Sequence, residues 1–352
     1  MNYVGLERLL LISRSLKYYS QTIMGKPIIA FVTGGYSGEA EISYKSAITI
    51  EANIDLHKFD FYKIDVRKDG WFYKGGDGTE IAIDKSDFTL TLNQKKISFD
   101  AVLIGIHGTP GEDGKLQGYL DLLDIPYTSC DAATSAITFN KRYTVAVAAF
   151  SGIHVARSLH YFKGDIINIK EISSQLNYPV FVKPNNGGSS IGMSKVNKEA
   201  DLKASLEKAF KEDNQILIEE LIRGREFTIG VCKINNEIIT LPFTEIITEN
   251  DFFDFEAKYQ GKSKEITPAQ VSELMAEKIQ NAAKKIYQIF NCSGIVRIDF
   301  IYNDEKQEPY MLEINTVPGQ SAASVVPQQV RAKGWTLKDF YSGLIEMALN
   351  KQ

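Results

Sequence analysis

The stretch that decides the fold lies near the C-terminus. It reads Gly294-Ile-Val-Arg-Ile-Asp-Phe-Ile-Tyr302, continues through a polar turn, and resumes as Tyr310-Met-Leu-Glu-Ile-Asn-Thr-Val-Pro-Gly319. Both segments alternate in polarity, which predicts two β-strands, each with one buried face. The residues that we assign to the buried face are Ile298, Phe300, Leu312 and Ile314.

The opposite face of this predicted hairpin carries charge. Because successive strand side chains point to opposite faces, Arg297 and Asp299 lie together, as do Glu313 and Asn315. Two neighbouring carboxylates are costly without a cation. Hard oxygen donors without Cys or His suit Mg²⁺ or Mn²⁺ rather than zinc, and protein-bound Mg²⁺ commonly shares its coordination with phosphates. The hairpin therefore predicts a metal–nucleotide site, and the alternative is a solvated sheet face with an ion pair.

The overall composition argues against several classes of protein. A chain of 352 residues is long enough for two or three domains. A net charge of −4 without a basic block argues against nucleic acid or a membrane as partner, and no apolar run has membrane-spanning length. Three scattered cysteines indicate a reducing compartment. We interpret residues 1–24 as a dispensable extension rather than a targeting segment.

Two glycine-rich turns follow predicted strands in the first third of the chain. The strand at residues 28–32 leads into Gly34-Gly-Tyr-Ser-Gly-Glu39 and a helix over residues 42–53. The strand at residues 100–106 leads into His107-Gly-Thr-Pro-Gly-Glu-Asp-Gly114. Open α/β sheets bind ligands at such strand ends, but the first turn does not match the dinucleotide motif G-x-G-x-x-G. Taken alone, Glu39 could simply complement a helix dipole, and His107 could be structural.

A third glycine-rich loop follows the strand that ends at Lys183. It reads Pro184-Asn-Asn-Gly-Gly-Ser-Ser-Ile-Gly192. Backbone N–H groups of such a loop form an anion nest, and the lysine adds a positive charge, so we interpret it as a phosphate site. It is not a P-loop, because it leads to a strand, and a plain hairpin turn is the alternative. The buried strand over residues 216–222 contains Glu219 and Glu220 and suits the hinge of a nucleotide site.

Two helices are predicted around the hairpin. One covers residues 139–151, with Lys141 in its first turn. The other starts at Thr267-Pro-Ala-Gln270, which has the form of a capped helix start, runs to about Phe290, and counts Leu274 among its core residues.

The remaining segments are a loop and a closing helix. Residues 249–265 contain no clear element, so we expect a loop that closes over the site. Residues 337–349 form an amphipathic pattern that predicts the last helix.

Seven motifs follow one another along the chain. They are Gly-Gly-Tyr-Ser-Gly-Glu39, His107-Gly with Gly-Glu-Asp-Gly114, Lys183-Pro with Gly-Ser-Ser-Ile-Gly192, Glu219-Glu with Glu226, Glu-Ala-Lys258-Tyr259, Arg297-Ile-Asp299, and Glu313-Ile-Asn315-Thr with Pro-Gly319. In this order they resemble the D-alanine–D-alanine ligases of the ATP-grasp superfamily, from about Lys26 to the C-terminus. The resemblance implies an α/β fold with an N-terminal open parallel α/β domain and two α+β domains that grip ATP. The implied domain limits are 26–129, 130–219 and 220–352, after an extension over residues 1–25.

The resemblance also implies a reaction. In the cytoplasm, the carboxylate of one D-alanine would attack the γ-phosphate of ATP to give an acyl phosphate. The amine of a second D-alanine would then displace phosphate, giving D-alanyl-D-alanine for peptidoglycan. Asp299, Glu313 and Asn315 would hold two Mg²⁺ (or Mn²⁺) ions. The implied ATP contacts are Lys141 and Lys183 on the α- and β-phosphates, Ser189 and Ser190 over them, Glu219 and Glu226 on adenine and ribose, the Leu221 backbone, Glu220 and Lys258.

The substrate contacts come from the same resemblance. Glu39 would bind the ammonium of the first D-alanine, and Ser324 would hold the carboxylate of the second. Arg297 and the Gly319 N–H would stabilise the tetrahedral oxyanion. The implied catalytic residues are Glu39, Ser189, Arg297, His107 and Tyr259, with His107 near the first substrate and Tyr259 closing over the site beside Ser189 and Glu39.

Alternatives and departures remain. A ligase of the same fold could join D-alanine to D-lactate or D-serine, although Tyr259 argues against lactate. An ATP-binding module without turnover should have lost Arg297 or a metal ligand, and this chain retains them. The chain has Asn186-Gly187 where many members have an acidic residue, and Gln320-Ser321 where Met-Thr is usual. The family further suggests a homodimer.

Overall fold

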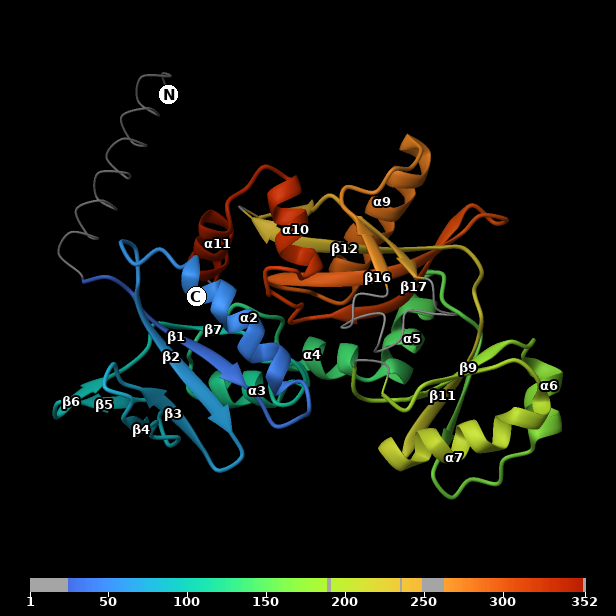
Figure 1. The fold of residues 1–352 in the computed structure, drawn as a ribbon, viewed down its shortest axis with the longest axis horizontal. Coiled ribbons are helices and arrows are strands. Elements are labelled where there is room, and N and C mark those ends of the chain that lie inside the picture. The colour runs from blue at the N-terminus through green and yellow to red at the C-terminus, as the bar shows by residue number, and fades with distance from the viewer. Residues whose placement is uncertain (1–24, 189–190, 235, 249–262, 351–352) are drawn as a thin grey trace, which may run out of the picture.

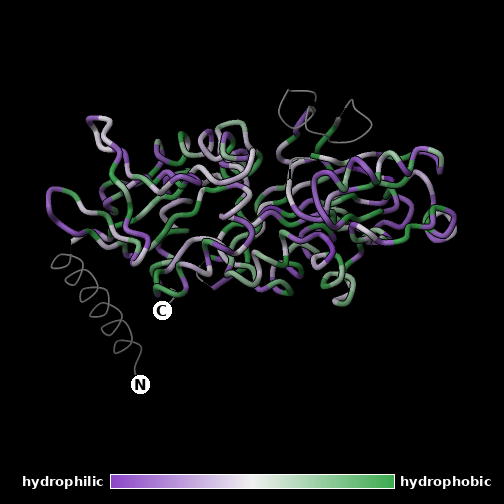
Figure 2. Tube along the Cα trace, turned by 90° about the horizontal axis from the view of Figure 1, so that it is seen from below, coloured by the Kyte–Doolittle hydropathy of each residue, from purple (hydrophilic) through white to green (hydrophobic). Residues whose placement is uncertain are grey.

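Three β-sheets form the frame of the molecule. The computed structural model describes residues 25–188, 191–234, 236–248 and 263–350. Figure 1 places the first sheet at the left, the second at the lower right and the third above the second. Hydrophilic loops gather at the two ends of the molecule, and hydrophobic stretches run between them (Figure 2). Within these ranges, no helix is long and apolar enough to cross a bilayer.

The first sheet has the strand order β4-β3-β2-β1-β7. Strand β1 runs parallel to β2 and β7, so the two glycine-rich turns leave the sheet at the same edge. Helices α2 and α3 follow these turns, and the helix after the first turn was predicted. The elements are β1 (Ile28–Gly34), α2 (Ala40–Ala52), β2 (Asp60–Arg67), β3 (Gly70–Lys74), β4 (Glu80–Ala82), the paired strands β5 (Leu90–Leu92) and β6 (Lys95–Ile97), β7 (Ala101–Ile104) and α3 (Lys115–Asp121).

The second sheet is antiparallel, with the order β10-β9-β11-β8. Its apolar face packs against α7, where Leu202 and Leu206 meet Val180 and Val182. The opposite face is left for the candidate site. The elements are β8 (Ser158–Phe162), α6 (Ile169–Gln175), β9 (Val180–Pro184), β10 (Ser194–Val196), a 3₁₀ turn (Glu199–Asp201), α7 (Leu202–Glu212) and β11 (Gln215–Glu220).

The third sheet contains the hairpin. Its order is β15-β14-β12-β16-β17, and β13 pairs with β12. Helix α9 covers its apolar face together with α4 and α5, because Ile137 and Ala148 pack in the same core as Ile279 and Ile298. The elements are α4 (Ala132–Phe139), α5 (Lys141–Phe150), β12 (Arg225–Ile234), β13 (Glu237–Thr240), β14 (Thr244–Thr248), β15 (Ser263–Ile266), α9 (Glu273–Ile289), β16 (Ile295–Asn303) and β17 (Glu308–Asn315).

The chain end ties the first and third sheets together. Helices α10 (Val325–Ala332) and α11 (Leu337–Leu349) share one core with both, in which Leu344 lies with Phe31 of β1 and Cys232 of β12. The predicted closing helix is confirmed with its limits. The predicted domain limits stay a prediction.

Two predicted helices have different limits in the structure. Residues 139–151 do not form one helix, because Asn140 leaves the helical conformation and its side chain caps α5 by accepting from the Tyr143 N–H at 3.1 Å. The predicted start at residues 267–270 is also wrong. Helix α9 begins at Glu273, where Ser272 accepts from the Met275 N–H. Leu274 is therefore 58% exposed rather than in the core.

The last three residues of the predicted loop over residues 249–265 belong to a strand instead. Residues 263–266 form strand β15, which pairs with β14. Residues 249–262, with Lys258 and Tyr259, lie outside the described residues, as do residues 1–24 and the phosphate-loop residues Ser189 and Ser190.

The first, second and third lobes are the parts of the molecule built on the first, second and third sheets. Gly294 marks a close approach of the third sheet to Thr128 of the first lobe. Its φ is +67°, and a Cβ there would lie 1.9 Å from the Thr128 carbonyl oxygen. Gly334 has a φ of +84° but no atom within 4 Å of such a Cβ. Gly334→Ala should therefore cost about 1–2 kcal/mol of unfolding free energy. Gly294→Ala should cost about 2–5 kcal/mol, because a backbone overlap adds to the strained φ.

Denaturant unfolding of the two variants and the wild type measures both effects. Gly334→Ala controls for the conformational strain alone. Equal losses for the two variants would mean that the Thr128 carbonyl moves away freely and that the close approach is no constraint.

Candidate active site

The hairpin has the predicted charged face. Asp299 pairs with Glu313 across the two strands, and Arg297 pairs with Asn315. The four polar side chains therefore share one face, and Ile298 and Ile314 are buried on the other. The prediction of one charged and one buried face is confirmed for these positions.

Leu312 is the exception, and its assignment to the core is wrong. A β-bulge between Asp299 and Phe300 makes Phe300 pair with Met311, so Leu312 is the extra residue. Met311 takes the buried place at 3% exposure. In a bulge two consecutive side chains can turn to the same side, and Leu312 lines the same cavity as Glu313.

Asp299 is the most enclosed member of the charged face. It is 8% exposed, and Thr228 donates a hydrogen bond to its Oδ1. Arg297 donates to both carboxylate oxygens, from Nε at 2.9 Å and from Nη2 at 2.8 Å. The same Nη2 lies 3.9 Å from Glu313 Oε1, and Asn315 Nδ2 donates to Asp299 Oδ2 at 3.3 Å. One guanidinium thus offsets the charge of two neighbouring carboxylates.

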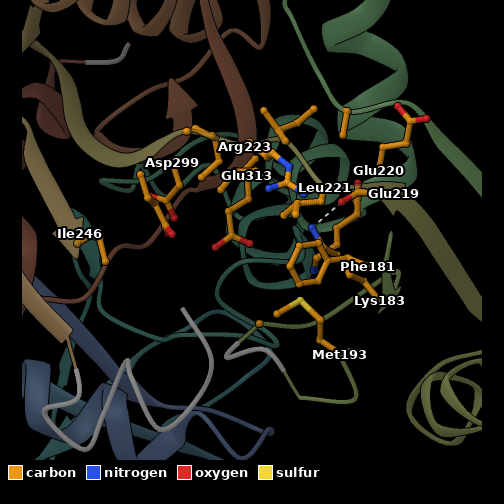
Figure 3. Close-up of a pocket in the computed structure, with 18 of the residues that line it drawn as sticks. Phe181, Lys183, Met193, Glu219, Glu220, Leu221, Arg223, Ile246, Asp299 and Glu313 are labelled. Carbon is orange, nitrogen blue, oxygen red and sulfur yellow. Dashed lines mark hydrogen bonds and ion pairs between the residues drawn. The ribbon is translucent and has the colours of Figure 1, made fainter. Parts of the chain in front are cut away.

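A cavity of about 550 Å³ lies between the second and third sheets. It brings together most of the predicted nucleotide residues from both sheets. Figure 3 shows Lys183 and Glu219 of the second sheet on one side and Asp299 and Glu313 of the third on the other. The predicted residues that line it are Lys141, Lys183, Glu219, Glu220, Leu221, Glu226, Asp299 and Glu313.

Lys183 keeps its charge inside this cavity. Burial works against the ammonium, but the ion pair with Glu219 outweighs it, and Glu313 and Glu226 add to the effect. The pKa of Lys183 is therefore raised. Positive charge held in this way suits a polyphosphate.

Four residues that form the apolar walls of the cavity were not predicted individually. Phe181, Met193 and Leu312 line it together with Ile246 of β14. The alternation of β9 could have indicated Phe181, because it shares a face with Lys183. An apolar slot beside carboxylates suits a heterocyclic base.

Glu220 and Leu221 of the predicted nucleotide hinge both have hydrogen-bond partners within the protein. The Glu220 carboxylate points away from Asp299 and Glu313 in Figure 3. It accepts from Asn177, at 2.9 Å from the backbone N–H and at 3.2 Å from the side chain. The Leu221 N–H donates to the Pro179 carbonyl at 3.1 Å, so this group is already paired.

The phosphate loop is fastened to the start of α5. Lys141 Nζ donates to the Gly187 carbonyl at 2.6 Å. Asn185, fully buried, accepts from the Arg142 N–H through its side chain and from the Lys141 N–H through its carbonyl. Asn186, part of a departure from the family pattern, bonds to Asp213 through both its nitrogens. These hydrogen bonds hold residues 185–187 of the loop in place.

Glu39 stands where the lobes meet. A Cβ on Gly108 would lie 2.5 Å from Glu39 Oε2, and a Cβ on Gly188 would lie 2.7 Å from Glu39 Oε1. The carboxylate therefore lies between the His107 turn of the first lobe and the phosphate loop of the second. Glu39 precedes α2 without capping it by a side-chain hydrogen bond, so helix capping does not explain it.

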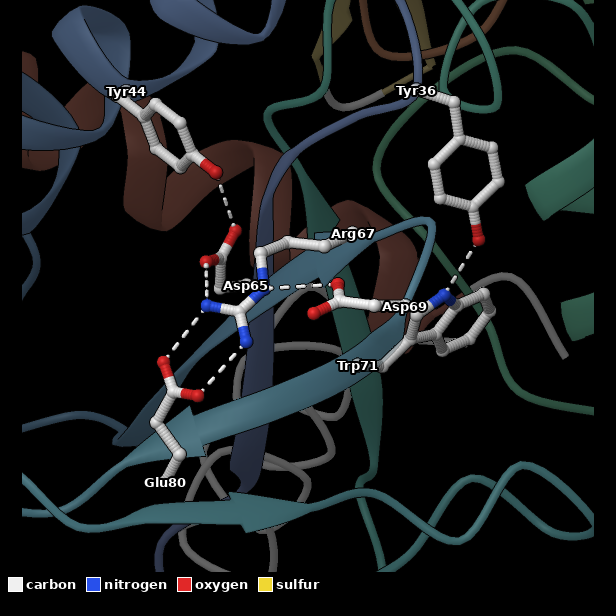
Figure 4. A network of polar contacts seen from close by, with 7 residues as sticks. All are labelled: Tyr36, Tyr44, Asp65, Arg67, Asp69, Trp71 and Glu80. Carbon is white, nitrogen blue, oxygen red and sulfur yellow. Dashed lines mark hydrogen bonds and ion pairs between the residues drawn. The ribbon is translucent and has the colours of Figure 1, made fainter.

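The turn before Glu39 is braced from its own sheet. Trp71 of β3 donates to the Tyr36 hydroxyl at 2.7 Å, and Tyr44 of α2 donates to Asp65 at 2.8 Å (Figure 4). Arg67 holds Glu80 through two bonds of 2.8 Å. These contacts fix both ends of the glycine-rich turn relative to β2.

His107 is buried, and both ring nitrogens have protein partners. Nδ1 lies 2.8 Å from the Val317 carbonyl oxygen, and Nε2 lies 2.9 Å from Ser46 Oγ. Burial lowers its pKa to about 4, so the ring is neutral at pH 7. The sequence pointed to the residue but not to its partners.

Glu112 is a second residue whose role the sequence did not reveal. Its carboxylate accepts from the Gly108 N–H at 2.7 Å and from the Val317 N–H at 3.3 Å. Removal from water, with the charge of Glu39 nearby, raises its pKa to about 8. It joins the His107 turn to the end of the hairpin.

The segment after β17 carries the other predicted substrate residues. A Cβ on Gly319 would lie 2.9 Å from Ser324 Oγ, so these two residues are in contact. Ser324 Oγ also lies 2.8 Å from Ser321 Oγ. Across the described ranges, no three or more His, Cys, Asp and Glu side chains form a metal-binding group. The hairpin offers two carboxylates and an amide, which are the hard oxygen donors that Mg²⁺ prefers.

Comparison with known proteins gives one consistent answer. A family model described as D-ala D-ala ligase N-terminus matches residues 28–130, and one described as D-ala D-ala ligase C-terminus matches residues 140–346. A D-alanine–D-alanine ligase from Flavobacterium johnsoniae is 46% identical over 91% of this chain and 99% of its own length. One from Parabacteroides distasonis is 43% identical over 93% and 99%.

Solved structures have the same fold. The VanG D-Ala:D-Ser ligase from Enterococcus faecalis superposes with a TM-score of 0.83 at 31% identity, covering 92% of this chain and all of that one. A D-alanine–D-alanine ligase from Bacillus anthracis complexed with ATP gives 0.74 at 26% identity, covering 92% and 97%. The predicted three-lobed α/β architecture is thereby confirmed.

Buried His107 should make stability depend on pH. Its pKa falls from the ordinary 6.5 to about 4 in the folded protein, so protons bind the unfolded chain first. The contribution of neutral His107 to the free energy of unfolding is therefore fully present above pH 6.5 and is lost as the pH falls towards 4. Between pH 7.5 and 5, the wild type should lose up to about 2 kcal/mol more unfolding free energy than His107→Gln.

Urea unfolding at both pH values checks this expectation. The same substitution at exposed His160 controls for the loss of one histidine. The burial argument is wrong if the wild type and His107→Gln lose the same amount between the two pH values.

Proposed function

The chain belongs to the D-alanine–D-alanine ligase family, and we propose that it joins two D-alanine molecules while converting ATP to ADP and phosphate. The first carboxylate takes the γ-phosphoryl group and becomes an acyl phosphate. The amine of the second D-alanine attacks that carbonyl, the C–N bond forms, and the C–O bond to phosphate breaks. One observation carries the proposal. Lys183 and Glu219 line one side of a cavity, and Asp299 and Glu313 line the other side.

ATP fits this cavity by chemistry as well as by size. Phe181 and Met193 offer apolar surface to adenine, and Glu219 and Glu226 offer acceptors to its amine and to the ribose. Lys141 and Lys183 meet the α- and β-phosphates. We assign Ser189, Ser190 and Lys258 to the same ligand on the motif match alone.

Asp299, Glu313 and Asn315 are the proposed Mg²⁺ (or Mn²⁺) ligands, for two ions. Bound there, the ions neutralise phosphate charge during transfer. The charge pattern supports the assignment, because the face brings two carboxylates together, and Arg297 pairs closely with Asp299 and reaches Glu313 at 3.9 Å. The Asp299 ion pair also keeps this carboxylate in place at the cavity edge.

The substrates lie at the junction of the lobes. Glu39 binds the ammonium of the first D-alanine, next to Gly108 and Gly188. Arg297 and the Gly319 N–H stabilise the oxyanion, and Ser324 binds the second carboxylate. No covalent enzyme intermediate is required, so the catalytic residues act by positioning and electrostatics. Tyr259 and Ser189 complete the proposed set.

The structural likeness to a D-Ala:D-Ser ligase keeps one alternative open. D-serine would use the same first step and differ only in the side chain of the second substrate. D-lactate would replace the attacking amine with a hydroxyl. The D-alanine–D-alanine relatives at 46% and 43% identity favour D-alanine for this chain. The proposal also includes a homodimer and a cytoplasmic place for peptidoglycan precursor synthesis.

Phosphate release tests the reaction and its second substrate. Purified protein with ATP and Mg²⁺ should release phosphate with D-alanine alone, and D-alanyl-D-alanine should be the product. Release only after addition of D-serine or D-lactate would move the chain to the alternative ligases. If ATP binds and no acceptor gives release, the proposed reaction is wrong.

Glu313→Gln tests the metal assignment. It should lower kcat by more than about 100-fold, because even outer-shell partners of metal ligands are worth about 10–100-fold. The fold should survive, since the side chain is not part of the core. Glu308→Gln, at the other end of β17 and paired with Lys278, is the matched control and should keep wild-type activity. Near-normal turnover of Glu313→Gln would remove it from the metal site.

A further inference from the structure

Three side chains of the first lobe hold one short segment of the third lobe. The segment is residues 317–320, which follow the hairpin and include Gly319. Glu112 accepts from the Val317 N–H at 3.3 Å, and His107 meets the Val317 carbonyl at 2.8 Å. Ser46 Oγ accepts from the Gln320 N–H at 3.0 Å. Gly319 therefore lies between two residues whose backbones are bonded to another part of the chain.

We propose that Ser46, His107 and Glu112 are positioning residues that aim the Gly319 N–H at the reacting carbonyl. The inference rests on the proposed function, which makes that N–H an oxyanion donor. Ser46 carries no motif signal and projects from α2, 274 residues away in sequence from Gln320. Its side chain is fully buried, so it acts through its bonds and not through contact with solvent.

The direction of each hydrogen bond follows from the partners. The Val317 carbonyl oxygen can only accept, so Nδ1 of His107 carries the proton. The buried ring is neutral, which leaves Nε2 as an acceptor. Ser46 must then donate its one hydroxyl hydrogen to Nε2 and accept from the Gln320 N–H. The directions of these hydrogen bonds are therefore fixed from the Val317 carbonyl through His107 and Ser46 to the Gln320 N–H.

This arrangement assigns His107 a role other than acid–base catalysis. Both ring nitrogens are used within the protein, so neither is available to exchange a proton with the substrate. The ring instead fixes the Val317 carbonyl relative to the turn that carries His107. That turn also contacts Glu39, which we assign to the first substrate. The hydrogen bonds of His107 therefore hold Glu39 at a fixed distance from the Gly319 N–H. A displacement of about 1 Å at a reacting centre can cost about 100-fold in rate.

The first test measures the position of the His107 proton in the wild-type protein. Long-range ¹H–¹⁵N NMR on the full chain, labelled at histidine, reports which ring nitrogen carries the proton. The chain has four histidines, and the spectrum of His107→Gln identifies the His107 signals. We expect a neutral ring with the proton on Nδ1 at pH 7. A proton on Nε2, or on both nitrogens, would overturn the inference.

The second test is the kinetics of Ser46→Ala. Loss of the hydroxyl frees the Gln320 N–H and removes the donor to His107, so kcat should fall about 10- to 100-fold. The KM for ATP should stay within about twofold, because Ser46 does not line the nucleotide cavity. The KM for ATP is thus the readout that a general loss of structure would change.

Ser135→Ala is the matched control. It also removes a fully buried helix hydroxyl, one that donates to the Cys130 carbonyl at 3.3 Å, and it should leave kcat unchanged. Equal losses in both variants, or a KM for ATP that rises in step with the fall in kcat, would refute the role of Ser46. If the wild type proves inactive yet has its proton on Nδ1, the proposed function fails and the hydrogen-bond directions stand.

Discussion

The structure depends on the cost of placing two carboxylates opposite each other on one sheet face. Like charges in directly paired positions of antiparallel strands repel, and Asp299 and Glu313 occupy such positions. The Arg297 guanidinium lowers this cost, because it bonds Asp299 closely and reaches Glu313 at 3.9 Å. Further positive charge on this face is therefore favourable, which is the physical reason to expect cations with a phosphate ligand there.

The same constraint explains why the site needs all three lobes. The carboxylates belong to the third sheet, and the lysines that face them belong to α5 and the second sheet. The first lobe supplies Glu39 and the side chains that hold residues 317–320. A core shared by β1, β12 and α11 keeps the first and third lobes in a fixed relation, so bonds across their junction can be short and directional. The second lobe meets this junction through Gly188 beside Glu39.

What the sequence could predict follows from the range of the interactions. Alternation within one strand is a local property, so the charged face at Arg297 and Asp299 was visible in the sequence. The bulge that turns Leu312 into the cavity depends on pairing with another strand. The alternation of polar and apolar residues along β17 alone does not indicate it. Asn140 interrupts a helical pattern only because its side chain caps the next helix. The contacts of His107 lie 61 and 210 residues away in sequence, and no local pattern records them.

The departure from the family pattern at Gln320 has a structural explanation of the same kind. A glutamine where methionine is usual would leave a buried amide unpaired, which costs about 1–3 kcal/mol. Here its Oε1 accepts from the Tyr341 hydroxyl at 3.1 Å, and its Nε2 donates to the Pro318 carbonyl at 3.1 Å. Tyr341 projects from α11, so the closing helix of the chain supplies the partner. The departure at Gln320 thus adds contacts that fix residues 317–320, beside the bond between Ser46 and the Gln320 N–H.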